Sequence, residues 1–258
     1  MNKTALITGA SSGIGLELSR IFVCNNYNLI MVSQNEENLK KAKSLLQEQN
    51  DKVSIITIAK DLADSAAPQE IFDYTQQHAI QVDVLINNAG IQVYGKFHDV
   101  DIEDTLAMMN VNIFALTRLT RLYVEEMVKR GSGKILNVSS TGAFQPCPLN
   151  AAYCAAKAFV LYLSEAIAEE IKGTGVTITT LCPGATRTNF AKRADIEDIK
   201  LFRGQLLESS KVAEIGYKAL MKNKSVVITG LTNKLVAESI RFMPRSVVTK
   251  IGMNVMKK

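Results

Sequence analysis

The sequence predicts an α/β fold with a doubly wound parallel sheet of about seven strands and helices on both faces. Short runs rich in β-branched residues alternate with longer amphipathic stretches, which is typical of βαβ units. Runs such as Val84-Leu85-Ile86 are apolar without alternation, as expected of strands covered on both faces. A glycine-rich turn follows the first predicted strand, where such sheets bind dinucleotides.

Hydrophobic periodicity gives each element in order. The predicted strands are Thr4–Thr8, Leu29–Ser33, Val53–Ala59, Val82–Ile86, Lys134–Ser139, Thr177–Cys182 and Val226–Thr229. The predicted helices are Ile14–Asn25, Glu37–Gln49, Pro68–Gln77, Ile102–Lys129, Ala151–Lys172 and Lys211–Asn223. We expect the strand order 3-2-1-4-5-6-7.

The 258 residues fit one catalytic and dinucleotide-binding domain over residues 1–233, followed by a basic helical extension over residues 234–258. The net charge of +5 lies entirely in that extension, which has six basic residues and one acid. The stretch of roughly residues 185–209 shows no clear element. Connections of that length inside a compact domain are usually functional, so we expect a lid.

Composition excludes several classes of protein. With 47% hydrophobic and 21% charged residues the chain can bury a full core, which a disordered protein cannot. The absence of Trp and an aromatic content of 6% disfavour nucleic-acid binding on stacked aromatics. Two His and four Cys without ligand spacing predict no metal site and a reducing, cytoplasmic compartment. Neither a leader nor an apolar run of about 18 residues is evident, so we expect a soluble protein, at most peripheral to a membrane.

The run from Thr8 to Gly15 has the features of a phosphate-binding turn. Gly9 lets the chain leave the strand sharply, Gly13 lets the backbone approach a phosphate, and Gly15 lets helix and strand pack closely. Ser11 and Ser12 can cap the helix, whose free amides and positive dipole end then face an anion.

A second group of residues predicts proton-transfer chemistry. Tyr153 and Lys157 are four residues apart in a predicted helix and share one face. An adjacent ammonium favours phenolate and lowers the pKa of the tyrosine, which can then exchange a proton with an alcohol or ketone. Ser140 ends the fifth predicted strand, where open α/β sheets place site residues. Ser139 is the alternative to Ser140 as the site serine, but strand alternation puts Ser139 on the opposite face. Asn110 and Asn112 are likewise alternatives for a site asparagine.

At these residues the chain resembles the single-domain form of the short-chain dehydrogenase/reductase family. The turn matches the family pattern Thr-Gly-x-x-x-Gly-x-Gly. Further matches run through most of the chain: Asp61-Leu62, Asn87-Asn88-Ala89-Gly90, Asn112, Ser140, Tyr153 with Lys157, and Pro183-Gly184 followed by Thr188. The resemblance implies a Rossmann-type fold and an NAD(P)-dependent oxidoreductase that interconverts a carbonyl compound and a secondary alcohol.

The resemblance also implies the cofactor contacts. Gly9, Ser11, Ser12, Gly13, Ile14 and Gly15 would hold the pyrophosphate; Asp61 and Leu62 the adenine; Asn88, Ala89 and Gly90 the adenosine ribose; Pro183, Gly184, Thr186 and Thr188 the nicotinamide side. Asn87 would tie strands together. In the family's mechanism Tyr153 is the acid/base, Ser140 holds the substrate oxygen, and Lys157 tunes Tyr153 and bonds the nicotinamide ribose. Asn112 would hold a water that links Lys157 to solvent.

Cofactor choice depends on the end of the second predicted strand. An acid there suits the ribose 2′-OH of NAD, and an Arg suits the 2′-phosphate of NADP. This chain has Ser33 and Gln34 in those places, and Ser12 where a basic residue could precede Gly13. Without an acid to repel the 2′-phosphate, we expect NADP(H) to be preferred, with NAD(H) as the alternative.

The predicted substrate is a lipophilic or acyl-type small molecule, because the expected walls are mainly apolar. They comprise Ile91, Gln92, Val93, residues 142–149, and Phe190, Leu201, Phe202, Leu206 and Leu207 of the lid. A dinucleotide-sensing regulator without turnover is the alternative function, although such proteins commonly lack the tyrosine. An epimerase or dehydratase would need a separate substrate domain.

Two predictions concern partners. The family's packing of long helices suggests a homodimer or homotetramer through Ile102–Lys129 and Ala151–Lys172. In the extension, Val247, Val248, Ile251 and Val255 form an apolar stripe flanked by basic residues. This stripe is either a packed or subunit-contacting helix, or a weak binding surface for an anionic membrane or an acidic carrier protein.

Overall fold

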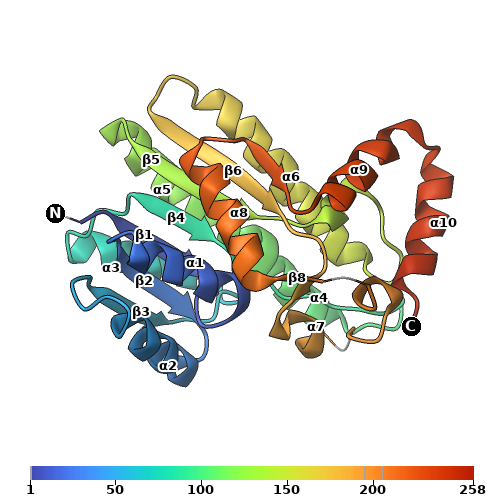
Figure 1. Ribbon diagram of the computed structural model, residues 1–258, viewed down its shortest axis with the longest axis horizontal. Coiled ribbons are helices and arrows are strands. Elements are labelled where there is room, and N and C mark those ends of the chain that lie inside the picture. The colour runs from blue at the N-terminus through green and yellow to red at the C-terminus, as the bar shows by residue number, and fades with distance from the viewer. Residues whose placement is uncertain (1, 195, 205) are drawn as a thin grey trace.

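The computed structural model describes residues 2–194, 196–204 and 206–258. Its main sheet has seven parallel strands in the order β3-β2-β1-β4-β5-β6-β9 (Figure 1). The strands are β1 (Thr4–Thr8), β2 (Asn28–Ser33), β3 (Ile55–Ala59), β4 (Val84–Asn87), β5 (Gly133–Val138), β6 (Val176–Cys182) and β9 (Val226–Ile228). The predicted fold class and strand order are confirmed.

Strand β1 shows why the sheet has two cores. Every residue of Thr4–Thr8 is buried, and successive side chains of a strand point to opposite faces. Ala5 and Ile7 belong to one apolar cluster and Leu6 belongs to the other. A continuous apolar run is therefore the pattern that this doubly covered strand requires.

Helices cover both faces (Figure 1). Helices α1 (Gly13–Cys24), α2 (Glu36–Gln47) and α8 (Ser209–Met221) pack on one core. Helices α3 (Ala67–Gln77), α5 (Leu116–Arg130) and α6 (Ala151–Glu170) pack on the other.

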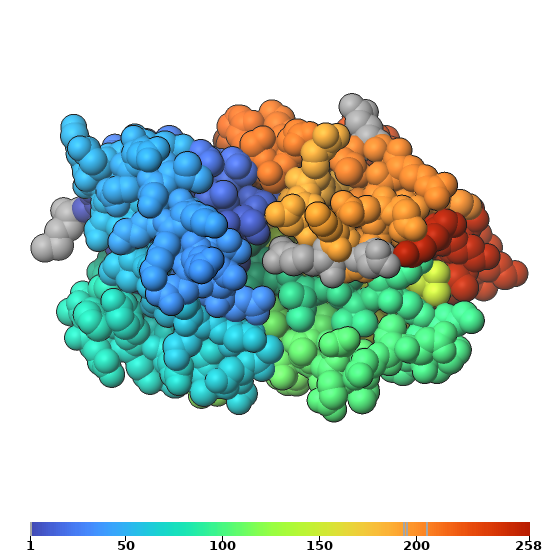
Figure 2. Space-filling model, turned by 90° about the horizontal axis from the view of Figure 1, so that it is seen from below, coloured from blue at the N-terminus to red at the C-terminus, as the bar shows by residue number. Residues whose placement is uncertain are grey.

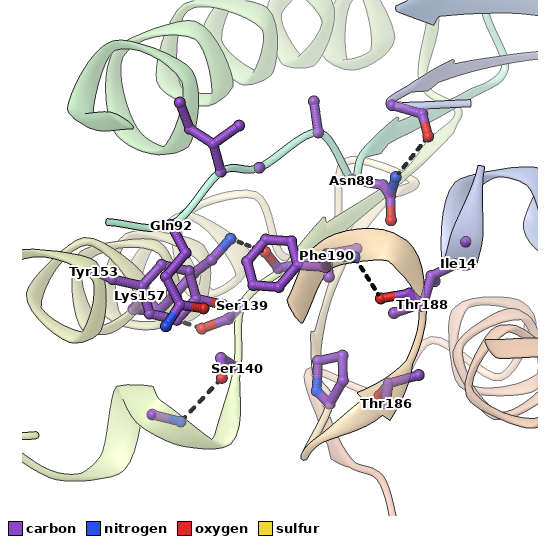
Figure 3. Close-up of a pocket in the computed structure, with 18 of the residues that line it drawn as sticks. Ile14, Asn88, Gln92, Ser139, Ser140, Tyr153, Lys157, Thr186, Thr188 and Phe190 are labelled. Atoms are coloured by element: carbon purple, nitrogen blue, oxygen red, sulfur yellow. Dashed lines mark hydrogen bonds between the residues drawn. The ribbon is translucent and has the colours of Figure 1, made fainter. Parts of the chain in front are cut away.

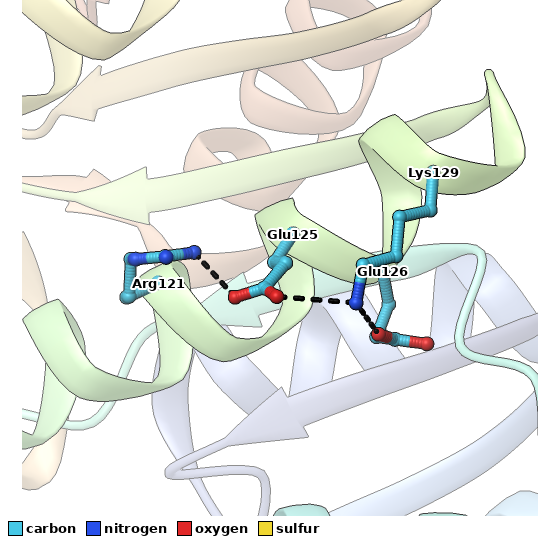
Figure 4. A network of polar contacts seen from close by, with 4 residues as sticks. All are labelled: Arg121, Glu125, Glu126 and Lys129. Atoms are coloured by element: carbon cyan, nitrogen blue, oxygen red, sulfur yellow. Dashed lines mark hydrogen bonds and ion pairs between the residues drawn. The ribbon is translucent and has the colours of Figure 1, made fainter.

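The charged face of α5 points to solvent. Glu125 accepts from Arg121 at 2.7 Å and pairs with Lys129 at 3.1 Å, and Lys129 also reaches Glu126 at 3.2 Å (Figure 4). These partners lower the pKa of the Glu125 carboxyl. Since all four side chains are exposed, each pair adds little to stability. The network marks which face of α5 is turned away from the core.

The predicted helix Ile102–Lys129 is not continuous. Helix α4 (Ile102–Met109) is followed by a π-helical segment, Asn110–Ala115, before α5 begins at Leu116. A π-helical turn widens the helix by one residue and often marks a functional site. Hydrophobic periodicity does not reveal such a local change of pitch, because Val111 and Ala115 of the segment are buried in the same core as α5.

The stretch 185–209, for which the sequence predicts no clear element, contains short ones. Strands β7 (Thr186–Arg187) and β8 (Leu207–Glu208) pair in parallel, and α7 (Asn189–Arg193) and a 3₁₀ turn (Lys200–Phe202) lie between them. These elements have two to five residues each, too few to leave a periodic signal.

After β9 the chain forms α9 (Leu231–Ser239), a 3₁₀ turn (Ile240–Phe242) and α10 (Arg245–Met256). Helix α10 returns to the body, where the Tyr94 hydroxyl donates to the Met256 carbonyl at 2.5 Å. The Lys200 amide donates to the Lys257 carbonyl at 3.2 Å. The extension therefore packs against the segment around the 3₁₀ turn Lys200–Phe202.

Helix α6 corrects one expectation about membranes. Ala151–Glu170 is long and apolar enough, by length and composition, to cross a bilayer. The sequence was expected to contain no apolar run of that length. The same helix buries Ala156, Val160 and Leu161 in this fold, and core helices pass the same test. Phe159 and Tyr162 of the same helix are exposed, so packing within the chain accounts for part of its apolar composition.

Buried amides tie the sheet to its helices. Asn87, at the end of β4, donates to Thr120 of α5 at 3.0 Å and to Asn137 of β5 at 2.9 Å. Asn137 donates to Ser164 of α6 at 2.9 Å. Asn87 thus has the strand-tying contacts expected of it.

Replacing Asn87 should test how much this network contributes. Asn87→Ala removes the buried donor to the Thr120 hydroxyl and to Asn137 Oδ1, so we expect a loss of about 1–3 kcal/mol in the free energy of unfolding. Urea denaturation measures it. Asn25→Ala is the control, because the exposed Asn25 amide donates to Ile21 within its own helix. Equal losses in both variants would contradict the assignment.

Candidate active site

A single large cavity lies at the carboxyl edge of the sheet, and part of it is shown in Figure 3. Residues at or just after six strand ends line it: Gly9, Ser33, Asp61, Asn88, Ser140 and Pro183. This is the edge at which open parallel sheets bind ligands. The structure therefore brings together predicted residues that are far apart in the sequence.

The turn between β1 and α1 is shaped by its glycines. Gly9 and Gly13 have φ of +64° and +57°, a region that favours glycine. A Cβ on Gly15 would lie 2.2 Å from the Gly9 carbonyl oxygen, so Gly15 permits close packing and does not itself line the cavity. Gly9, Ser11, Ser12, Gly13 and Ile14 do line it.

The first turn of α1 can receive an anion. Ser12 is the extended N-cap residue and its side chain makes no capping bond, so the first amides of α1 keep their donors for a ligand. A Cβ at Gly13 would come within 3.2 Å of the Thr188 methyl group. Glycine at this position therefore leaves space for a pyrophosphate beside the first turn of α1.

Thr8 and Asn88 lock this turn onto β4. The Thr8 hydroxyl accepts from the Asn88 and Ala89 amides, both at 3.0 Å. The Asn88 side chain donates to the carbonyls of Thr8 at 2.9 Å and Gly9 at 3.2 Å (Figure 3). Asn88, Ala89 and Gly90 line the cavity as predicted, but the Asn88 amide group is used to hold the turn.

The adenosine end contains a cation that sequence reasoning missed. Ser33, Asp61 and Leu62 line the cavity there, and so do Gln34 and Lys60. The Ser33 hydroxyl lies 2.9 Å from that of Ser11, and the Lys60 amide donates to the Ser33 carbonyl at 3.1 Å. Parallel pairing of β2 with β3 sets this neighbourhood, whereas a search confined to the end of β2 finds no basic residue.

Ser140, Tyr153 and Lys157 converge deeper in the cavity (Figure 3). Ser140 follows β5 and accepts from the Gly142 amide at 3.1 Å, and its hydroxyl lowers the pKa of the Tyr153 hydroxyl. Lys157 Nζ lies 5.6 Å from the centre of the Tyr153 ring and donates to the Val138 carbonyl at 3.0 Å. The rival Ser139 donates to the Lys157 carbonyl at 2.7 Å, so its hydroxyl is committed to helix α6.

Burial controls the protonation of this group. It lowers the pKa of the Lys157 ammonium to about 8 and raises the pKa of the Tyr153 hydroxyl, against a smaller lowering by the Ser140 hydrogen bond. The pKa of Tyr153 is therefore raised in the protein alone, because desolvation of the phenolate is the largest influence on it. The expected lowering of this pKa by Lys157 stays a prediction.

Asn112 sits behind the cavity wall. Its amide accepts from the Ile91 N–H at 3.0 Å and donates to the Ile91 carbonyl at 2.8 Å. A Cβ on Gly90 would lie 3.2 Å from Asn112 Oδ1 and 3.4 Å from Lys157 Nζ, so both groups reach the same glycine. Asn110 instead donates to the Ala63 carbonyl at 3.1 Å, away from this group.

The opposite wall is built by the segment after β6. Pro183, Gly184, Thr186 and Thr188 line the cavity, and the Thr188 hydroxyl caps α7 by accepting from the Phe190 amide at 3.2 Å. The Phe190 ring is 5.9 Å from the Tyr153 ring. This wall brings an aromatic side chain directly beside the tyrosine.

The predicted substrate wall is correct in part. The residues that line the cavity are Ile91, Gln92, Gly142, Gln145, Cys147, Phe190, Leu201 and Phe202. The others do not: Val93, Ala143, Phe144, Pro146, Pro148, Leu149, Leu206 and Leu207. Gly252, Val255 and Met256 of α10 line it instead; their place in the tail gave no sequence signal for a site.

The buried ammonium has a measurable consequence. Between a pKa of about 8 in the folded state and 10.5 in the unfolded state, the unfolded chain binds more protons, so rising pH stabilises the fold. Below pH 8 the burial penalty is fully present. Urea denaturation at pH 7 and pH 10 should therefore show wild-type stability increasing relative to Lys157→Met. A difference that does not change with pH would contradict this account.

Comparison with known proteins agrees with this architecture. The short chain dehydrogenase family model matches residues 3–198. The chain is 30% identical to a D-beta-hydroxybutyrate dehydrogenase of Rhizobium meliloti over 88% of each protein. It is 32% identical to the ketoacyl reductase HetN of Nostoc sp. over 70% of this chain, spanning 63% of that relative.

A solved structure shows the same similarity. A short-chain dehydrogenase from Sphingobium yanoikuyae, in complex with NADPH, superposes with a TM-score of 0.83 at 28% identity, covering 93% of this chain and 92% of that one. Together with the match over residues 3–198, this places the chain in the short-chain dehydrogenase/reductase family, as an NAD(P)-dependent oxidoreductase.

Proposed function

We propose that the enzyme interconverts a lipophilic or acyl-type ketone and its secondary alcohol, with NADP(H) as the preferred cofactor. The observation that carries the proposal is the group formed by Ser140, Tyr153 and Lys157 at the base of the cavity. A bound nicotinamide supplies or accepts the hydride. The residues of the chain must then hold the substrate oxygen and move a proton.

Tyr153 and Ser140 are assigned to donate hydrogen bonds to the reacting oxygen of the substrate. The raised pKa of the Tyr153 hydroxyl keeps it protonated at neutral pH, so it can donate to a carbonyl oxygen that is being reduced. The Ser140 hydroxyl, which lines the cavity together with Tyr153, can donate to the same oxygen and stabilise its developing charge.

Lys157 and Asn112 are assigned to proton supply. With its pKa lowered to about 8, Lys157 can exchange a proton near neutral pH. Asn112 Oδ1 and Lys157 Nζ flank the same Gly90, which supports the proposed water relay. The two hydrogen bonds of the Asn112 side chain to Ile91 fix the backbone at that point.

The proposed cofactor contacts follow the cavity from the β1–α1 turn to α7. The pyrophosphate would be held by Gly9, Ser11, Ser12, Gly13 and Ile14, with Gly15 behind; the adenosine by Ser33, Asp61, Leu62, Asn88, Ala89 and Gly90; the nicotinamide by Tyr153, Lys157, Pro183, Gly184, Thr186 and Thr188. The unused first-turn amides of α1 support this orientation.

Lys60 supports the preference for NADP(H). It is the basic side chain beside Ser33 in the described cavity lining, and it is half exposed and paired with Glu70. An ammonium that can turn from Glu70 to a phosphate would favour a 2′-phosphate over a 2′-OH. The structural relative from Sphingobium yanoikuyae was solved with NADPH.

The substrate class rests on the far wall. Phe190, Leu201, Phe202, Val255 and Met256 give this end of the cavity an apolar lining, which suits a lipophilic molecule. The retained Ser140, Tyr153 and Lys157 group argues against the alternative of a dinucleotide-sensing regulator without turnover.

We also propose a cytoplasmic homodimer or homotetramer. Four unpaired cysteines, three of them buried, are consistent with a reducing compartment. Phe114, Phe159 and Tyr162, near or on the helices expected at the subunit interface, are exposed by 60%, 40% and 67%, which is unusual for large apolar side chains without a partner.

Tyr153→Phe tests the assigned proton donor. It keeps the ring and removes the hydroxyl, so we expect carbonyl reduction to fall by at least about 100-fold with NADPH affinity nearly unchanged. Turnover with a panel of ketones and NADPH fluorescence titration measure the two quantities. Tyr162→Phe, on the exposed face of the same helix, is the control. A variant that keeps a tenth of the rate would show that Tyr153 is not the acid/base.

Lys60→Ala tests the cofactor preference. We expect wild-type enzyme to prefer NADPH by roughly ten-fold, about 1.4 kcal/mol, and the variant to lose most of that preference without loss of NADH affinity. Ser33→Asp should turn the preference toward NADH by charge repulsion. Lys52→Ala, at an exposed lysine outside the cavity lining, is the control. A wild-type preference for NADH, or equal loss of both cofactors in Lys60→Ala, would overturn the assignment.

A further inference from the structure

Residues 231–258, here called the C-terminal arm, form a bent pair of helices at one end of the molecule. Figure 1 shows α9 leaving the body after β9 and α10 returning to it, and Figure 2 shows the arm at the end opposite the N-terminal strands. Of the nine residues of α9, Ala237 is the buried one. Helix α9 is therefore almost without a packing partner within the described chain.

Large apolar side chains project from the arm into solvent. Phe242, in the turn between the two helices, is 88% exposed, and Leu231 and Leu235 are 74% and 62% exposed. Val236, Val247 and Ile251 are exposed by 41% to 51%. A monomeric soluble protein seldom exposes so many large apolar groups on one short segment, so the arm has the composition of a contact surface.

The same segment carries the charge of the protein. Its basic residues are Lys234, Arg241, Arg245, Lys250, Lys257 and Lys258, and its one acid is Glu238. Arg241 and Arg245 stand on either side of Phe242 in the sequence, and Glu238 lies 3.7 Å from Arg241. Because the remaining chain balances to zero, the arm is where an anionic surface would be attracted.

We propose that the C-terminal arm docks on an anionic lipid bilayer, with Phe242, Leu235 and Leu231 entering the interface. Apolar side chains beside cations are the pattern of interfacial helices, which combine burial with attraction to anionic headgroups. A second copy of this arm is a poor occupant, because two segments of like charge would repel. A side chain at a protruding turn suits a fluid interface better than a protein partner, which would need a preformed pocket.

The inner face of α10 connects docking to the site. Val248, Gly252 and Met256 are buried, and Gly252, Val255 and Met256 line the cavity. The helix that carries Val247 and Ile251 outward is thus also a wall of the substrate end. If the enzyme has the proposed function, docking would bring a ketone or alcohol dissolved in the lipid next to the cavity wall. The docking itself does not depend on that function.

Vesicle co-sedimentation of the full-length protein tests the proposal. We expect wild-type protein to sediment with phosphatidylcholine vesicles that contain phosphatidylserine at low salt, and at least ten-fold less at high salt or with phosphatidylcholine alone. Phe242→Asp and Leu235→Asp should each reduce binding at least ten-fold. Leu45→Asp is the control, because Leu45 is 47% exposed on α2, at the end of the molecule opposite the arm (Figure 1).

Docking would be overturned by no binding of wild-type protein, by equal loss in Leu45→Asp, or by binding to an acidic acyl carrier protein but not to vesicles. A lower mass of Phe242→Asp in sedimentation velocity would also overturn it, because the surface would then be a subunit contact. NADPH-dependent turnover of a water-soluble ketone should be unchanged in Phe242→Asp. If no variant or wild-type protein reduces any ketone, the proposed function fails while the vesicle result stands.

Discussion

Parallel pairing of seven strands is the constraint on which the rest of the structure depends. It requires each connection to return to the same end of the sheet, so that all the carboxyl ends meet at one edge. Gly9, Asn88 and Ser140 become neighbours in one cavity for this reason. The site is thus a consequence of topology first and of side-chain chemistry second.

Within that frame, two close approaches set the geometry of the site. Gly15 permits helix α1 to touch the Gly9 carbonyl, and Thr8 with Asn88 fastens the turn to β4.

On the other side of the cavity, burial of the Lys157 ammonium works against folding at neutral pH. Its hydrogen bond to Val138 offsets part of this cost. A cation held in such a place is explained more readily by chemistry than by stability.

The sequence was sufficient for features that repeat or that have a fixed spacing. Strand runs such as Thr4–Thr8 and the pair Tyr153 and Lys157 are local patterns, and the structure has them where they were expected. The π-helical segment Asn110–Ala115 was not predicted, because its buried Val111 and Ala115 continue the four-residue spacing of Leu119 and Tyr123 in α5. Lys60 was missed because its neighbourhood with Ser33 arises from pairing of β2 with β3. The cavity wall formed by α10 depends on a tertiary contact between the tail and the segment around Leu201.

The tail shows how one helical stripe can serve two surfaces. The sequence suggested a single apolar stripe of Val247, Val248, Ile251 and Val255, but at 3.6 residues per turn these positions span about a quarter of the helix circumference. Val247 and Ile251 form its outer margin and are exposed by 41% and 49%, whereas Val248 is buried and Val255 lines the cavity. One margin of the stripe therefore faces solvent, and the other margin faces the body of the protein. A contact made by its outer margin would therefore be made on the same helix whose inner residues line the cavity.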